Sequence, residues 1–238
     1  MKVYVVFDNR AASPEFISGW GFSVFLRPQG LLFDTGSEPR SLLHNLSLFN
    51  IAPEEIHSVF VSHFHWDHAG GLLGLLPFLS SPTIFLHRGF SGGFVSEVKR
   101  LGGRVVSLEG PCELAPDIFT TGPIPAATTE AALVLNIKGK LALLTGCAHP
   151  GILNLVLGTK EFFGEIPTFA GGGFHLLQTS KKEARILAEK LKALGVDLVA
   201  PSHCTGERAL AAFADIFQDG FLEIGAGAII PLAEMLGD

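Results

Sequence analysis

Six consecutive residues, His63-Phe64-His65-Trp66-Asp67-His68, carry three imidazoles and one carboxylate. Imidazole nitrogens and carboxylate oxygens are good ligands for zinc and similar divalent ions. Coordination requires neutral imidazole and ionised carboxylate, and both groups hold these forms near pH 7. The segment therefore predicts a metal site, and any fold of this chain must bring its four ligands together.

The residues on either side of the motif predict its local structure. Residues 58–61 are apolar and partly β-branched, which indicates a buried strand, and residues 69–76 indicate a helix packed on it. The motif then lies on a strand-to-helix turn. Its first two histidines, two positions apart in extended chain, can point the same way, while its aspartate and last histidine face a second point. This spacing favours two metal ions over one.

A histidine-rich surface loop is the alternative. Such a loop would not normally hold Phe64 and Trp66 between its ligands or be flanked by core sequence. We therefore predict a site for two divalent ions. Zinc is the favoured metal, and manganese or iron are the alternatives.

The His-x-His-x-Asp-His pattern resembles the hallmark of the metallo-β-lactamase superfamily. The resemblance covers nearly the whole chain and includes four further segments in the family's order. They are Asp34-Thr35-Gly36, Thr145-Gly146-Cys147-Ala148-His149-Pro150-Gly151, Gly172-Gly173-Phe174-His175 and Pro201-Ser202-His203-Cys204-Thr205-Gly206. The last three are similar to one branch of the superfamily, the 7,8-dihydropterin-6-methyl-4-(β-D-ribofuranosyl)aminobenzene 5'-phosphate synthase-like proteins.

The resemblance implies ligands beyond the hexapeptide. The superfamily usually has an aspartate that bridges the two metals where this chain has Cys147. We favour His149, two residues on, as a ligand. Cys147 is a second candidate, because thiolate sulfur also binds zinc. The structural alternative for His149 is a capping residue before the helix that Pro150 is placed to start.

Three more residues have roles that the resemblance implies. His203 matches the final ligand histidine and should join Asp67 and His68 at the second metal. The alternative for His203 is a buried histidine that is hydrogen-bonded in a loop. Asp34 is expected to accept a hydrogen bond from a ligand imidazole and so fix its tautomer. His175 follows a run of glycines and is the candidate for proton delivery or oxyanion stabilisation, with metal ligation as its less favoured role.

Asp67 is counted with His175 and Asp34 among the residues expected to serve catalysis. We do not expect His87 and Cys204 to bind metal. His87, at the end of a predicted strand, is expected at the surface. Cys204 is expected to pack inward or to support the ligands from behind.

Composition favours one compact enzyme. The chain has 238 residues, with no Ser/Pro-rich linker and no block of charge, so we predict a single domain over residues 1–238. The hydrophobic fraction of 47% against 17% charged residues implies an extensive core. The net charge of -6 argues against a nucleic-acid-binding surface.

Location and partners follow from the same composition. The N-terminal apolar run is too short for a signal peptide and no other run is long enough to span a bilayer, so we expect a cytoplasmic protein without a membrane partner. Three cysteines cannot all pair, which agrees with a reducing compartment. The oligomeric state stays open.

Periodicity along the chain predicts an α/β fold. Residues 3–7, 22–26 and 31–33 indicate an opening run of strands, and further strands are expected at 83–86, 104–107, 133–137, 141–144, around 168 and at 197–200. Helices are expected over 38–49 and 180–194 and starting at 151 and 206, and a short helix is expected in the Gly-rich stretch between the strands at 83–86 and 104–107. The predicted fold is a metallo-β-lactamase-like αβ/βα sandwich, with two central mixed sheets flanked by helices and the site at the strand ends.

These observations predict a metal-dependent hydrolase that uses a metal-bound hydroxide on a small, anionic, phosphorylated or ester substrate. Helices that begin near residues 151 and 206 would point their amino ends at the site and favour anionic groups. A pterin-related synthase, as the branch name implies, is one alternative. A di-iron redox protein on the same fold is another, although the flavin-partnered di-iron branch has a carboxylate where this chain has His65. A non-catalytic metal-binding module is the third.

Overall fold

Two sheets packed face to face form the centre of the computed structural model, which describes residues 1–237. The first sheet has the strand order β13-β1-β2-β3-β4-β5-β6 and the second has the order β12-β11-β10-β9-β8-β7. The bounds in the first sheet are β1 (Lys2–Phe7), β2 (Ser23–Arg27), β3 (Leu31–Phe33), β4 (Ser58–Phe60), β5 (Thr83–His87), β6 (Arg104–Leu108) and β13 (Ile229–Ile230). Those in the second are β7 (Cys112–Ala115), β8 (Ile118–Thr120), β9 (Leu133–Ile137), β10 (Lys140–Thr145), β11 (Phe169–Gly173) and β12 (Leu198–Ser202).

Both sheets are mixed. In the first, β13, β1, β2 and β3 pair antiparallel, and β3 to β6 pair in parallel. In the second, β7 to β10 are antiparallel, whereas β10, β11 and β12 are parallel. Parallel neighbours end at the same edge of a sheet, so the loops that follow β4, β10, β11 and β12 gather side chains from distant parts of the sequence.

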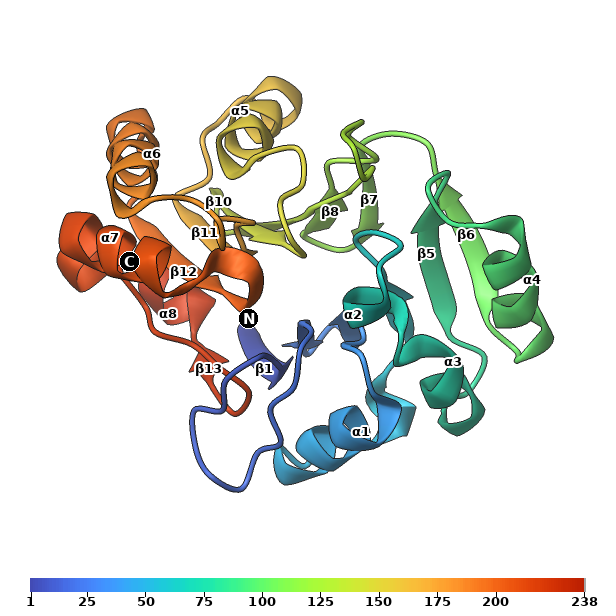
Figure 1. Cartoon of the computed structure of the whole chain (residues 1–238). Coiled ribbons are helices and arrows are strands. Elements are labelled where there is room, and N and C mark those ends of the chain that lie inside the picture. Colours follow the sequence, from blue (N-terminus) through green and yellow to red (C-terminus); the bar gives the residue numbers. More distant parts are fainter. Residues whose placement is uncertain (238) are drawn as a thin grey trace.

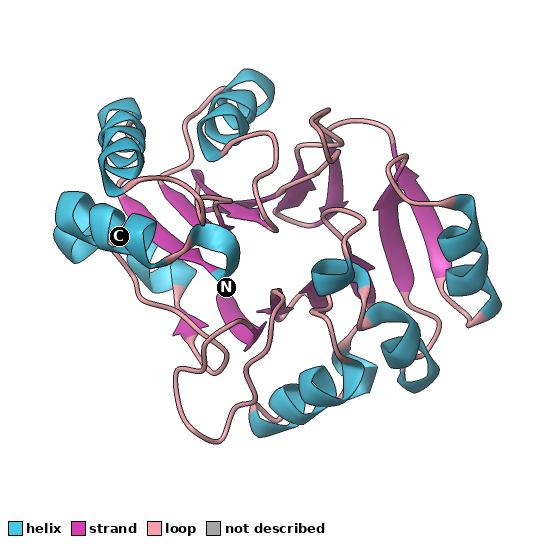
Figure 2. Ribbon diagram, in the orientation of Figure 1, coloured by secondary structure: helices cyan, strands magenta, loops and turns pink. Residues whose placement is uncertain are grey.

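Helices cover the outer face of each sheet (Figures 1 and 2). The helices α1 (Pro39–Leu48), α3 (Leu72–Leu75) and α4 (Gly92–Arg100) lie on the side of the first sheet. The one-turn helix α2 (Trp66–Ala69) follows the end of β4. The helices α5 (Ile152–Phe163), α6 (Lys181–Leu194) and α7 (Glu207–Phe217) cover the second sheet. The short helix α8 (Leu232–Leu236) contacts β1 and β9. The predicted αβ/βα sandwich is therefore confirmed.

Alternation along the strands explains why the sheets stack. In β2, Val24 and Leu26 join the core between the sheets, while Phe25 points outward to the helices of the first layer. Side chains two apart share one face of a strand, so a fully apolar strand fills both cores. A third buried cluster joins the outer face of the second sheet to α5, α6 and α7.

The helix predicted over 69–76 forms as two short pieces, α2 and α3. The carbonyl of His68 accepts hydrogen bonds from the backbone N–H and the hydroxyl of Thr35, at 2.7 and 2.8 Å, instead of one from the next turn. A Cβ on Gly71 would lie 2.2 Å from the Thr35 carbonyl oxygen. These contacts hold residues 63–71 against the loop that follows β3.

Four short elements were not predicted: β7, β8, β13 and α8. The prediction of a surface position for His87 was wrong, because this residue is 2% exposed and its Nε2 lies 2.9 Å from the Ser62 carbonyl oxygen behind the motif. None of the helices within residues 1–237 combines the length and the apolar character needed to cross a membrane. The single domain stays a prediction.

Candidate metal centre

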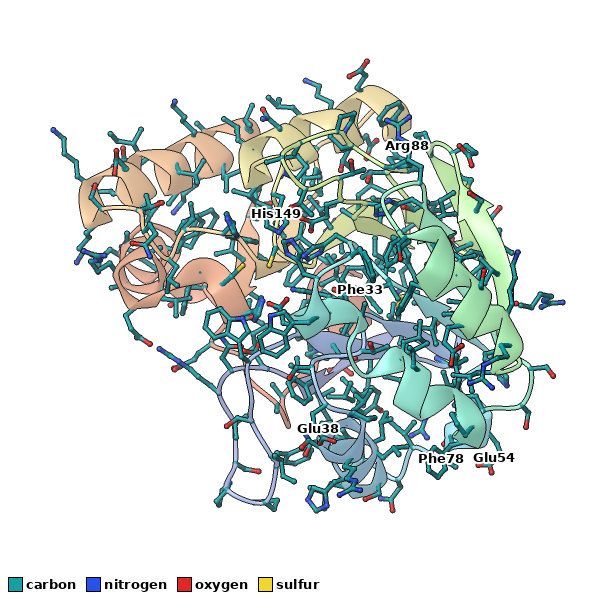
Figure 3. All side chains as sticks on the ribbon, turned by 45° about the vertical axis from the view of Figure 1, so that its right-hand side comes forward. Phe33, Glu38, Glu54, Phe78, Arg88 and His149 are labelled. Carbon is teal, nitrogen blue, oxygen red and sulfur yellow. The ribbon has the colours of Figure 1, made fainter. Side chains whose placement is uncertain are left out.

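The residues predicted as ligands meet where the two sheets present their strand ends. The hexapeptide follows β4 of the first sheet, whereas Cys147 and His149 follow β10 and His203 follows β12 of the second. Figure 3 labels His149 near the centre of the molecule. Segments more than one hundred residues apart in sequence therefore form one site.

The first group of donors consists of three histidines, His63, His65 and His149. His63 Nε2 lies 3.1 Å from His65 Nδ1, and the ring of His149 is 4.8 and 4.9 Å from the other two rings. His149 Nε2 is buried and has no hydrogen-bond partner among the described residues. A buried nitrogen without a partner is unfavourable unless something outside the chain binds it.

The second group combines Asp67, His68, Cys147 and His203, all of them buried. His68 Nε2 lies 3.2 Å from His203 Nε2 and 3.3 Å from Cys147 Sγ. Asp67 Oδ2 is 3.3 Å from His203 Nε2 and 3.7 Å from His68 Nε2. Two ligands of one tetrahedral zinc at 2.0–2.1 Å stand about 3.3 Å apart, so the spacing of these four atoms fits one ion.

The two groups are adjacent. The rings of His63 and His68, one from each group, have centroids 4.2 Å apart. The structure thus brings together every residue that the sequence analysis predicted as a ligand, including Cys147 at the position of the usual bridging aspartate.

Electrostatics favour the coordinating form at His63, His149 and Asp67. Burial and the neighbouring imidazoles hold the pKa of His63 well below its usual range, and burial with His175 and His65 lowers the pKa of His149 to about 4. Burial would raise the pKa of Asp67, but the hydrogen bond with His203 and the charge of His68 lower it to about 2. Near pH 7 these groups are neutral imidazoles and a carboxylate. At His68, burial would lower the pKa but the charge of Asp34 raises it, and a hydrogen bond with Cys204 raises the pKa of Cys147.

Buried acceptors orient the histidines from behind, as expected for Asp34. His68 Nδ1 lies 2.6 Å from Asp34 Oδ2, and the same carboxylate accepts hydrogen bonds from the backbone N–H and the hydroxyl of Ser62. The Ser62 hydroxyl is also 2.9 Å from His63 Nδ1. On the other side, His203 Nδ1 lies 2.9 Å from Asn9 Oδ1. Such partners set which ring nitrogen faces the site.

Glu130 was missed by the sequence analysis. Its carboxylate is fully buried, and one oxygen accepts the backbone N–H groups of Gly146, Cys147 and Ala148 while the other accepts that of His149. Burial raises the pKa of Glu130, and these hydrogen bonds oppose the shift. The available signal was a lone acidic residue directly before the apolar run 131–135.

Trp20 was missed as well. Its indole N–H donates to Asp67 Oδ2 at 3.0 Å, and its ring lies 5.3 Å from that of His203. Nothing in the local sequence around Trp20 points to this role, because the contact depends on how the loop after β1 folds back.

His175 stands at the edge of the two groups. Its side chain is exposed, its ring is 4.4 Å from that of His149, and its backbone N–H donates to Cys204 Sγ. Cys204 is buried, as expected, and forms a third possible donor group with His175 and Cys147. The backbone φ angles of Asp34, His175 and His203 are +56°, +55° and +51°, in the left-handed region that non-glycine residues rarely adopt.

The family model of the metallo-β-lactamase superfamily matches residues 29–203. The chain belongs to this superfamily, which confirms the resemblance drawn from its motifs. The match includes the hexapeptide, Cys147, His149 and His203.

Three individual proteins are similar to this chain over almost its whole length. The 7,8-dihydropterin-6-methyl-4-(beta-D-ribofuranosyl)-aminobenzene-5'-phosphate synthase of Methanocaldococcus jannaschii is 28% identical, over 97% of this chain and 96% of its own. The crystal structure of Tm1679, described as a metal-dependent hydrolase of the β-lactamase superfamily, superposes with a TM-score of 0.83 at 30% identity, covering 97% of this chain and 98% of that one. Human tRNase Z, short form, shares the fold with a TM-score of 0.58 at 16% identity.

Proposed function

We propose that the chain is a hydrolase that depends on two divalent metal ions and acts on a small anionic substrate. The observation that carries this proposal is the pair of adjacent donor groups. They are His63, His65 and His149 in the first, and Asp67, His68, Cys147 and His203 in the second. The two groups lie where strand ends of both sheets meet, and the similar protein Tm1679 is described as a metal-dependent hydrolase of the same superfamily.

The donors suit such ions. The first set offers three neutral imidazoles, and the second adds a carboxylate and a thiol. Nitrogen with one sulfur ligand favours zinc, and manganese or iron are alternatives for the all-nitrogen set. The unpaired buried His149 Nε2 supports ligation, since a cation would bind this lone pair. When bound, a pair of divalent ions supplies Lewis acidity and makes water a nucleophile near neutral pH.

The chain's own groups would then orient the reactants. Asp67 stays ionised and is held by the Trp20 indole, so that its carboxylate cannot rotate freely. His175 is exposed at the rim, where its imidazole can deliver a proton to a leaving group. A hydrogen bond with Cys204 raises the pKa of His175, which favours the protonated form that this role requires.

Support for an anionic substrate comes from α5. This helix begins at Ile152, three residues after His149, and no side chain caps its N-terminus at Gly151. Free N–H groups at a helix N-terminus carry partial positive charge and attract anions.

Hydrolysis of bis-p-nitrophenyl phosphate and of an aryl thioester, with zinc or manganese and with a chelator, tests the proposal. We expect metal-dependent turnover that Asp67→Asn lowers at least a hundredfold. Asp215→Asn, on the surface of α7, is the matched control and should leave turnover unchanged. Absence of turnover on both compounds with two ions bound would contradict the hydrolase proposal.

A second candidate is the pterin-related synthase. It is favoured by one observation, the 28% identity to the M. jannaschii synthase over almost the full length of both chains. Condensation would appear as metal-dependent joining of a dihydropterin, with a leaving group such as diphosphate on its 6-methyl carbon, to the amine of a ribofuranosylaminobenzene 5'-phosphate, with release of that leaving group. The hydrolase assays above would stay negative in that case.

A further inference from the structure

A cavity of about 590 Å³ lies beside the candidate metal centre. Its polar lining includes Asp8, directly after β1, and Ser202, the last residue of β12. The helix α7 provides a wall through Glu207 and Leu210. The cavity therefore opens where one strand of each sheet ends.

Two of the polar side chains in this lining lack partners. Asp8 and Ser202 are only 1% and 5% exposed. Within residues 1–237, neither Asp8 Oδ2 nor Ser202 Oγ has a partner at normal hydrogen-bond geometry, whereas Asp8 Oδ1 accepts the backbone N–H of Asn9 at 2.6 Å. The two side chains are neighbours, and burial raises the pKa of Asp8 to about 6 although the Ser202 hydroxyl and His203 lower it. Buried polar atoms are costly to leave without a partner, so a ligand that offers donors would satisfy both.

The charge of the lining is negative. Three carboxylates, Asp8, Glu207 and Glu223, face one guanidinium, that of Arg10. Arg10 is already engaged, because it forms ion pairs with Glu207 and, at 3.7 Å, with Glu223. An anion would meet uncompensated negative charge, whereas a cationic or N–H-rich group would be attracted.

The remaining wall is apolar and suits a ring. It consists of side chains from α7 and the segments around it, among them Leu177, Leu210, Ala211, Ala214 and Phe221. Pockets for small molecules combine such a surface with a few polar groups that set orientation.

The cavity and the candidate metal centre share two side chains. His203 and Trp20 line the cavity, and both contact Asp67 of the second donor group. A molecule bound in the cavity would therefore lie against His203, a member of the second donor group.

We propose that this cavity binds an amine- or amidine-bearing ring of the substrate, at the end remote from the anionic group that lies near α5, with Asp8 and Ser202 accepting its N–H donors. Its role as a substrate subsite rests on the proposed hydrolase function. Binding of an amidine group in the cavity does not depend on that function.

Calorimetric titration of the metal-loaded protein with benzamidine and with benzoate tests the binding. The two probes share a ring and differ in charge. Benzamidine should bind at least tenfold more tightly than benzoate. Equal binding, or no binding of benzamidine, would overturn the proposal.

Variants locate the bound probe. Asp8→Asn should weaken benzamidine binding at least about tenfold, because it removes a charge-assisted hydrogen bond, and Ser202→Ala should weaken it less. Asp215→Asn is the same change outside the cavity and should have no effect. Asp8→Asn removes an unpaired buried charge, so its thermal midpoint should equal or exceed that of the wild type. Undiminished binding in a folded Asp8→Asn protein would place the probe elsewhere and overturn the assignment.

An ester pair tests the link to turnover. p-Nitrophenyl 4-guanidinobenzoate should have a kcat/KM at least tenfold above that of p-nitrophenyl benzoate, and Asp8→Asn should remove this preference through KM. Turnover of both esters without a preference would overturn the subsite. If neither ester is turned over, the hydrolase proposal fails while the benzamidine titration still decides the binding.

Discussion

Asp34 illustrates how much of this site depends on residues behind the candidate ligands. Its two oxygens hold the ring of His68 and the backbone and hydroxyl of Ser62, and all three residues are fully buried. A Thr-Gly-flanked aspartate after a strand could be predicted from the sequence, since the family motif marks it. Asn9 and Trp20 could not, because their contacts span 194 and 47 positions and no local pattern encodes them. For Glu130 the only local signal is an acidic residue before an apolar run, which does not name its four N–H partners.

Asp34→Ala should weaken zinc binding. Loss of the acceptor frees the ring of His68 to rotate and leaves Ser62 without its partner, so we expect affinity at the second group to fall about 10- to 100-fold. Competition with a chromophoric chelator measures this affinity. Asp215→Ala is the control, and an unchanged affinity in Asp34→Ala would show that the orientation of His68 does not depend on Asp34.

Glu130→Gln should destabilise the protein although it changes one atom. One oxygen can still accept three N–H groups, but the new amide N–H₂ would face the N–H of His149. Two buried donors facing each other should cost about 2 kcal/mol or more. Urea unfolding measures the free energy, with Glu161→Gln on the surface of α5 as the matched control. Equal stabilities of the two variants would refute this role of Glu130.

At the scale of elements, the longer segments with clear periodicity were predictable and the short ones were not. The strands of the two cores and the helices α1, α5, α6 and α7 form where expected. By contrast, β13 and α8 have two and five residues, and only packing against β1 and β9 stabilises them. The break between α2 and α3 depends on the contact of Thr35 with His68, which joins residues 33 positions apart.

The strand β11 should not tolerate a side chain at Gly172. Its φ is +101°, and a Cβ there would lie 2.0 Å from the carbonyl oxygen of Thr145 on β10. We expect Gly172→Ala to lower the free energy of unfolding by more than about 2 kcal/mol. Gly93→Ala in α4 is the control, because a Cβ there meets nothing within 4 Å, and it should stabilise by up to about 1 kcal/mol. Similar effects of Gly172→Ala and Gly93→Ala on the free energy of unfolding would contradict the close contact between Gly172 and Thr145.

The helix α1 should show a pH-dependent cap. The Glu38 side chain accepts hydrogen bonds from the backbone N–H groups of Arg40 and Ser41. Burial alone would raise the pKa of Glu38, but these bonds lower it overall. A lowered folded-state pKa means stability that is present above the unfolded pKa and is lost as the pH falls through the folded value.

Glu38→Gln should therefore cost about 1 kcal/mol at pH 7 and less at pH 3. Urea unfolding at both pH values gives the difference, and Glu54→Gln at an exposed site is the control. A gap between wild type and Glu38→Gln that widens toward pH 3 would contradict the sign.

At the scale of the whole molecule, the candidate ligands come from both sheets. The hexapeptide belongs to the first sheet, and Cys147, His149 and His203 belong to the second. Ions held there would join the two layers and stabilise the folded state by a free energy that grows with the logarithm of their affinity. From the sequence, His63 could already be paired with His65, and His203 could be placed with Asp67 and His68. Neither Cys147 nor His149 could be assigned to a group, since that assignment depends on how the sheets stack.

Elemental analysis of the purified protein, reloaded with zinc and freed of excess metal, tests the central claim most directly. The wild type should hold two zinc ions per chain, and His149→Ala and His203→Ala should each hold one while remaining folded by circular dichroism. One zinc in the wild type, or two in both variants, would contradict a binuclear centre built from these residues.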